Sequence, residues 1–118
     1  MSNTFALSGE SGIALAELIA ERFRVLGDAT RIRLLDTLRE GPATVGELQQ
    51  AIGSSQQNVS RHLGVLLRNR LVERHRAGGF SRYAIADESV FEMCEQVCGG
   101  MRRRLAGLDA VLEGAPAR

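Results

Sequence analysis

The side chains best suited to chemistry lie in residues 54–72, which read SSQQNVSRHLGVLLRNRLV. Apolar residues recur there at helical spacing, which predicts an amphipathic helix. Its opposite face carries the amides of Gln56 and Gln57, the hydroxyl of Ser60 and the guanidinium of Arg61. Amides suit the edge of adenine, and a guanidinium suits guanine or phosphate. The pattern indicates a helix that lies in the major groove of DNA, although a solvated surface helix has a similar pattern.

The charge of the chain is unevenly distributed. The formal net charge is only +1, which is small for a protein that binds nucleic acid. Residues 54–86, however, contain six arginines and one acid (+5), whereas the rest of the chain contains nine arginines and thirteen acids (−4). Positive charge is therefore concentrated in the predicted reading helix and the segment that follows it, as expected for an electrostatic contact with phosphates.

Length and composition predict a globular protein. The 118 residues are 44% hydrophobic and 25% charged, which is typical of one globular domain. No apolar run could span a membrane and no segment has the pattern of a secretory signal, so we expect a cytoplasmic protein without a membrane partner. We expect a flexible N-terminus at 1–11, a folded domain at 12–113 and a flexible tail at 114–118.

Three helices are predicted before the reading helix. The first spans about residues 12–26, and the second begins after the N-cap Asp28. The third begins at Thr44, whose spacing to Glu47 is that of a capping box, and ends at Gly53. A short helix, a turn and a longer helix in this order form a helix-turn-helix. The buried face of the second helix is predicted to comprise Ile32, Leu35 and Leu38.

After the reading helix the period changes from helical to two. The runs VERHRA and FSRYAI flank Gly78-Gly79, a strong hairpin signal. Val72 is expected to anchor the first strand in the core, and the arginines at 74, 76 and 82 are expected to project from the ribbon. A basic hairpin in this position predicts a wing that contacts phosphates or the minor groove.

The last predicted helix begins at the N-cap Asp87 and carries a heptad-like apolar seam. Such a seam requires a partner, which could be the first helix of the same chain or the helices of a second subunit. The steps between its members alternate between three and four residues. The seam comprises Phe91, Cys94, Cys98, Met101, Leu105, Leu108 and Leu112.

The order of these elements and four of their segments resemble the ArsR/SmtB family of bacterial repressors. The segments are LGDATRIRLLDTL, SQQNVSRHLGVL, LVERHRAGG and SRYAI, and the match covers about residues 13–112. The resemblance implies a mainly α fold with a small β-hairpin: a winged helix-turn-helix in the order α-α-α-α-β-β-α, dimerised through its first and last helices. It also implies a homodimeric repressor that binds double-stranded DNA at an inverted repeat and is released by an inducer.

The resemblance also indicates which residues contact DNA. On the recognition helix, at 55–69, they are Ser55, Gln56, Gln57, Ser60, Arg61 and His62, and on the wing they are Arg76 and Arg82. His62 has a second interpretation as a packed, hydrogen-bonded core residue, because it adjoins Leu63.

The inducer site of this chain departs from that of the metal-sensing members. Where such members carry a cysteine-rich run on the third helix, this chain reads ELQQAIG, and its last helix has no histidine. Cys94 and Cys98 remain, four residues apart on one side of that helix. They could bind arsenite, copper(I) or zinc, or sense sulfide or oxidants through their thiols. They could also simply pack in the seam, and a regulator without a ligand is a further alternative.

Two other classes of function fit less well. An enzyme would need a group to orient a pair such as Cys94 and His75, and no such group or phosphate-binding loop is evident. A winged-helix domain that binds only other proteins would have the same fold. That alternative does not require Gln56, Gln57 and Arg61 on one face together with a basic wing. The sequence therefore favours a DNA-binding regulator and predicts no enzymatic activity.

Overall fold

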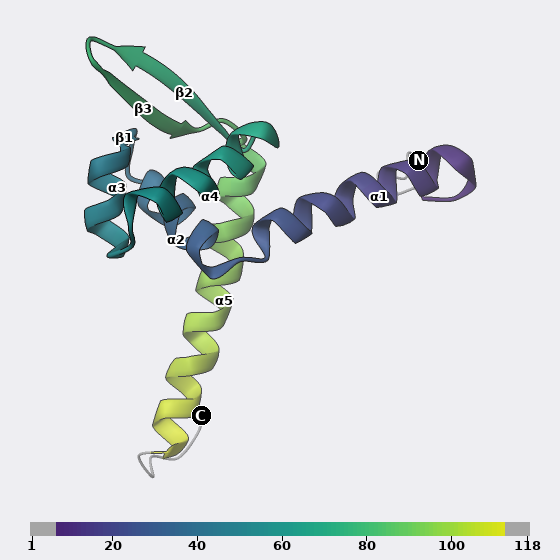
Figure 1. Ribbon diagram of the computed structural model, residues 1–118. Helices are drawn as coiled ribbons and strands as arrows, with labels where there is room; N and C mark the ends of the chain where they lie inside the picture. Colours follow the sequence, from purple (N-terminus) through teal and green to yellow (C-terminus); the bar gives the residue numbers. More distant parts are fainter. Residues whose placement is uncertain (1–6, 113–118) are drawn as a thin grey trace. The chain divides into compact units, whose positions relative to one another are not determined.

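The computed structural model describes residues 7–112, and Figure 1 shows their helices and strands. The predicted tail at 114–118 and residues 1–6 of the predicted flexible N-terminus lie outside the described residues. Chain contacts define two compact units, one that ends at Ala86 and one that begins at Asp87. The first unit contains α1 (Gly9–Leu26), α2 (Ala29–Leu38), β1 (Ala43–Thr44), α3 (Val45–Ile52), α4 (Gln56–Arg68), β2 (Val72–Ala77) and β3 (Phe80–Ile85). The second contains α5 (Glu88–Leu112).

This order confirms the predicted winged helix-turn-helix, and the predicted caps explain where its helices begin. The Asp28 side chain accepts a hydrogen bond from the Arg31 backbone N–H at 3.1 Å, which satisfies a donor of the first turn of α2. Thr44 and Glu47 form the predicted capping box of α3. Gly53 ends α3 with φ +66°, a conformation that glycine adopts without steric cost. One difference is that α1 begins at Gly9, three residues earlier than expected.

The core of the first unit lies where α2, α3 and α4 pack on one another. Its apolar side chains are almost completely removed from water, which is the main source of stability for a domain of this size. The residues buried to 2% exposure or less are Leu34, Leu35, Leu48, Val59, Leu63, Leu66, Leu71 and Val72. The predicted anchoring of the wing by Val72 is thereby confirmed.

The prediction that Ile32 is buried is wrong. Its side chain remains 42% exposed, whereas Leu34, Leu35 and Leu38 form the buried face of α2. Successive side chains of an α-helix are rotated by about 100° around the helix axis. The mean direction of the three leucines is therefore rotated by roughly 110° from that of Ile32, but it is close to that of Arg31. A charged residue therefore takes the inward position that the sequence pattern suggested for Ile32.

The two strands of the wing are joined by a third strand that the sequence did not predict. β2 and β3 pair antiparallel on either side of the Gly78-Gly79 turn, and β1 pairs with the other edge of β3. Ala43 lies opposite Tyr83 and Thr44 opposite Arg82. A strand of two residues contains no measurable alternation, so only the tertiary pairing reveals it.

Both long helices carry apolar residues that the described chain leaves uncovered. On α1, Leu18 is 70% exposed and Phe23 58%, although Val25 and Leu26 at its end are buried. On α5, the seam residues Met101, Leu105, Leu108 and Leu112 are exposed. Among the described helices, none has the length and apolar character needed to cross a membrane.

The contrast between Leu66 and Ile32 provides a test of the core. Replacing Leu66 by alanine should lower the free energy of unfolding by about 2–5 kcal/mol, because it leaves a cavity in a fully buried site. Ile32→Ala should cost less than about 1 kcal/mol, because much of that side chain is already in water. Urea denaturation of both variants measures the difference, and equal losses would contradict the described core.

Candidate nucleic-acid interface

The two faces of α4 separate as its sequence predicted. Val59, Leu63 and Leu66 are buried on the side that packs against α2 and α3. Along the opposite side, polar side chains are exposed on consecutive turns, so they could reach the edges of bases if this face entered a groove. These exposed residues are Gln56, Gln57, Ser60 and Arg61, and the N-cap Ser55 precedes them.

Short hydrogen bonds at the start of α4 hold Arg61 in place. Its Nη2 donates to Oδ1 of Asn58 at 2.6 Å, and Nδ2 of Asn58 donates to Oγ of Ser54 at 2.8 Å. The Ser55 hydroxyl accepts from the Asn58 backbone N–H at 3.1 Å, which confirms the predicted N-cap. Arg61 is exposed and starts from an ordered position on α4, so it would lose less side-chain entropy if it bound DNA.

His62 lies on the inner side of α4, whereas the side chains of Gln57 and Arg61 are exposed. It is 5% exposed, and its Nδ1 lies 3.0 Å from Nη1 of Arg31. Of the two interpretations of this histidine, the structure favours the hydrogen-bonded core residue, because the ring is almost completely buried and contacts Arg31. We therefore omit His62 from the DNA-contacting set.

Burial determines the charge state of His62. Removal from water lowers the pKa of the imidazole, the nearby carboxylate of Asp28 raises it, and the guanidinium groups of Arg61 and Arg31 lower it further. The net shift is below the ordinary value, so the ring is neutral at pH 7. A neutral Nδ1 can accept the hydrogen bond from Arg31.

The arginines of the wing divide between its two faces. The register of β2 and β3 sets Arg74 and Arg76 on the face that carries Val72, and Arg82 on the opposite face. Arg82 lies 3.7 Å from the carboxylate of Glu47, with both side chains more than half exposed. Arg76 has no ion pair within residues 7–112. The two wing arginines predicted to contact DNA thus start from different electrostatic environments.

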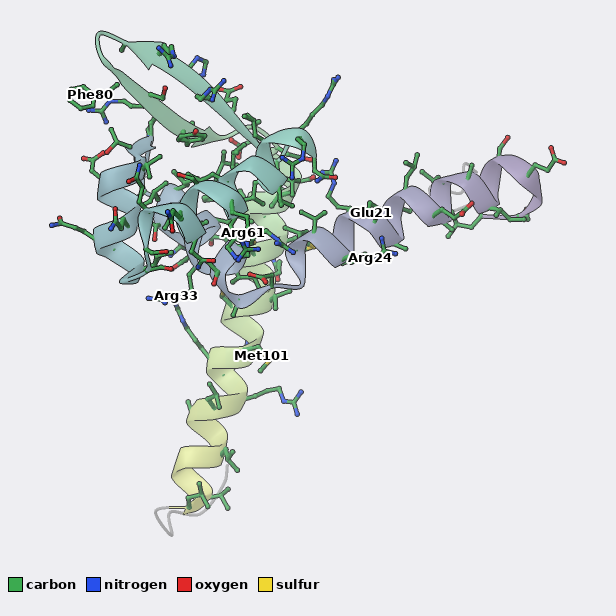
Figure 2. All side chains as sticks on the ribbon, viewed as in Figure 1. Glu21, Arg24, Arg33, Arg61, Phe80 and Met101 are labelled. Carbon is green, nitrogen blue, oxygen red and sulfur yellow. The ribbon has the colours of Figure 1, made fainter. Side chains whose placement is uncertain are left out.

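Two residues near these arginines were missed by the sequence reasoning. Glu47 was recognised as a cap but not as the partner of Arg82, since only folding brings α3 beside β3. Phe80, at the start of β3, is 71% exposed and projects from the wing in Figure 2. A period-two run that begins with an aromatic residue directly after a glycine turn could have indicated an aromatic tip.

The candidate sensor residues belong to the second unit. Cys94 and Cys98 are half-buried on α5, which continues as a regular helix through both positions and through Gly99-Gly100. Neither cysteine forms a disulfide in the part of the chain that the structure describes. Within that part, no group of three histidine, cysteine or acidic side chains could hold a metal ion.

Comparison with protein families supports the class of the first unit. Residues 26–75 match a family model described as a helix-turn-helix domain. Rv0081 of Mycobacterium tuberculosis, an HTH-type transcriptional regulator, is 37% identical over 100 residues, which cover 84% of this chain and 88% of that protein. Its crystal structure superposes with a TM-score of 0.70 at 35% identity, covering 78% of this chain and 93% of that one.

Two other solved structures have the same fold. The solution structure of Mb0332 from Mycobacterium bovis is a homodimeric winged helix-turn-helix DNA-binding domain, described as a possible ArsR-family regulator. It has a TM-score of 0.74 and 27% identity, covering 89% of this chain and 94% of that one. The antimony-specific transcriptional repressor AntR has a TM-score of 0.71 and 28% identity, covering 90% and 93% respectively.

The fold and the exposed face of α4 define a winged helix-turn-helix protein of the DNA-binding class. The comparisons identify its family, because the matched relative is similar over most of both chains. The chain belongs to the ArsR/SmtB family of transcriptional regulators. The matched relatives Rv0081 and SdpR are, respectively, a regulator and a repressor of transcription.

The buried histidine predicts how stability depends on pH. The unfolded chain binds a proton on His62 with a pKa near 6.5, whereas the folded chain binds it only at lower pH. This contribution to stability is therefore complete above pH 6.5 and is lost as the pH falls through 6.5 toward the lowered value. His62→Asn should remove this part of the pH dependence. Urea denaturation between pH 5 and 8 measures it, and parallel curves for both proteins would contradict the prediction.

Proposed function

We propose that this protein is a homodimeric transcriptional repressor that binds an inverted-repeat operator in double-stranded DNA. The observation that carries the proposal is the exposed face of α4, where Gln56, Gln57 and Arg61 stand opposite a fully buried apolar face. The basic wing follows directly and provides cations for the adjoining phosphates. The solved relative AntR is a transcriptional repressor, which supports repression as the outcome of binding. A regulator of this kind acts on the chromosome, so we propose a cytoplasmic location.

The uncovered apolar residues of α1 and α5 support the homodimer. Leu18 and Phe23 on α1, and Leu105 and Leu108 on α5, expose about half or more of their surfaces. A second copy would cover such residues and would present two α4 helices to one duplex, which matches the symmetry of an inverted repeat. The homodimeric domain from M. bovis supports this assembly for the fold. We propose residues 12–113 as the unit that folds and pairs.

The two wing arginines should contribute unequally to DNA binding. A phosphate contact releases counterions, so Arg76→Ala should reduce the slope of log affinity against log salt by about one. Arg82→Ala should reduce it less, because Arg82 must first leave Glu47, from which it lies 3.7 Å away.

The proposed base contact of Arg61 gives a separate prediction. Arg61→Ala should lower the binding free energy by on the order of 1–3 kcal/mol on an operator, and by little on random duplex.

Gel retardation at several salt concentrations measures these effects. The probe is a duplex selected from a random pool by the wild-type protein, with an unrelated duplex of equal length as the control. If the wild-type protein retards no duplex even at low salt, the DNA-binding proposal fails and a protein-binding winged helix becomes the better interpretation. Equal slopes for the wild-type protein and Arg76→Ala would remove the wing contact from the proposal.

We further propose that Cys94 and Cys98 make the repressor inducible. The two residues are one helical turn apart, with Cβ atoms about 5–6 Å from each other in a regular helix. A disulfide needs about 3.5–4.5 Å. A two-electron oxidant such as a peroxide, which takes up the electrons and protons of both thiols, would therefore form a bridge only by unwinding α5, and Gly99-Gly100 would assist this. Alternatively, two chains would contribute four thiolates to a soft ion such as arsenite, copper(I) or zinc. One chain alone supplies only these two thiols, in keeping with the lack of a three-ligand group in residues 7–112.

Serine variants test the thiols separately from the DNA contacts. Cys94→Ser and Cys98→Ser should bind the selected duplex as tightly as the wild-type protein, because both residues lie on α5 outside the proposed interface. Arsenite, copper(I) or a persulfide donor should release the wild-type protein from DNA but leave the variants bound. Fluorescence anisotropy of a labelled duplex measures the release, and normal release of both variants would mean that the cysteines only pack.

A further inference from the structure

A small polar cluster lies beneath the exposed face of α4, where the end of α1 meets α2 and α4. Its members are Asp28 and Arg31 at the start of α2, His62 on α4 and the backbone carbonyl of Val25 on α1. His62 is the buried side chain of the cluster, at 5% exposure, and its neighbour Leu63 is 1% exposed. A buried imidazole is costly unless its polar atoms have partners, so the contact of His62 with Arg31 is tightly constrained.

Arg31 connects all three helices. Its Nε donates to the Val25 carbonyl oxygen at 2.5 Å, and its Nη1 donates to Nδ1 of His62 at 3.0 Å. Its own backbone N–H donates to Asp28, which fixes the start of α2. The planar guanidinium can make both side-chain contacts at once, which the single ammonium of a lysine cannot do in the same geometry. The end of α1 is therefore joined to the second turn of α4 through one side chain.

His62 can take part in this connection only in its neutral form. Because Nδ1 accepts from Arg31, the ring proton resides on Nε2. Nε2 lies 3.4 Å from Nη2 of Arg61, and since both atoms then donate, this approach is not a hydrogen bond. Protonation would remove the acceptor and add a positive charge between the guanidiniums of Arg31 and Arg61. The carboxylate of Asp28, 3.8 Å from Nδ1, opposes that effect only in part.

We propose that Arg31 and His62 are positioning residues for sequence-specific DNA recognition. Their contact holds α4 at a fixed rotation against the α1–α2 junction, and so aims Arg61 and the two glutamines of the first turn. Contacts with phosphates tolerate a small rotation of α4, whereas base edges do not. Loss of the contact therefore weakens binding to the operator more than binding to random duplex. The inference rests on the proposed DNA-binding function.

Variants of His62 separate positioning from simple filling of space. Asparagine carries an amide oxygen near the position of Nδ1 and does not titrate, so His62→Asn keeps the acceptor at every pH. Leucine fills a similar volume without an acceptor. His75, the other histidine of the chain, is exposed on β2, and His75→Asn is the matched control for His62→Asn.

A second pair of variants tests the two contacts of the Arg31 side chain. Arg31→Lys removes the planar guanidinium that makes both contacts, and Arg33→Lys, on the exposed side of α2, is its control (Figure 2).

The experiment measures fluorescence anisotropy with the selected duplex and an unrelated duplex between pH 5.5 and 8. Urea denaturation at each pH confirms that the proteins are folded. At pH 7.5, His62→Leu and Arg31→Lys should bind the selected duplex at least about tenfold more weakly than the wild-type protein, with random duplex little changed. The ratio of specific to random affinity should fall on acidification for the wild-type protein and for His75→Asn, but not for His62→Asn.

Several outcomes would overturn the inference. If His62→Asn loses specificity on acidification as the wild-type protein does, His62 is not the group that titrates. If Arg31→Lys retains the wild-type ratio of affinities, the double contact does not aim α4. If His62→Leu fails to fold, the pH profile of His62→Asn and the Arg31→Lys ratio still decide the question. Failure of the wild-type protein to select any duplex would instead overturn the proposed function itself.

Discussion

Packing of the apolar face of α4 against α2 and α3 is the constraint on which the rest of the structure depends. Val59, Leu63 and Leu66 recur at helical spacing, so one side of a rigid helix is committed to the core. The amides of Gln56 and Gln57 are thereby left exposed to solvent. The proposed recognition residues are thus positioned by a core that would take no direct part in recognition.

The same packing explains why the core contains a histidine. His62 occupies the helical position between Val59 and Leu66 on the inward side, so it is buried along with them. A buried imidazole needs a hydrogen-bond partner, and Arg31 supplies one from the inward side of α2. The polar cluster is therefore a consequence of the register of two helices, and it ties the end of α1 to the proposed reading surface.

The proposed recognition and sensor residues occupy separate parts of the chain. The exposed face of α4 and the wing belong to the unit that ends at Ala86, whereas Cys94 and Cys98 belong to α5. In the repressor that we propose, a change in the thiols would have to reach α4 through a change in how helices pack within a dimer. The exposed seam residues of α5, such as Leu105 and Leu108, are suited to this role because their burial depends on what covers them.

The sequence alone determined the features that depend on neighbours along the chain. Helical period, the caps at Asp28, Thr44 and Ser55 and the glycine turn of the wing all involve residues a few positions apart, so local physical chemistry is sufficient. The family resemblance extended this to the fold class.

Contacts between distant residues could not be predicted in the same way. The pairing of β1 with β3, the ion pair of Glu47 with Arg82, and the exchange of Ile32 for Arg31 on the inward side of α2 were decided only by tertiary structure. The physical reason is that a side chain is buried by residues of other helices and strands. These residues come close only when segments tens of residues apart pack together.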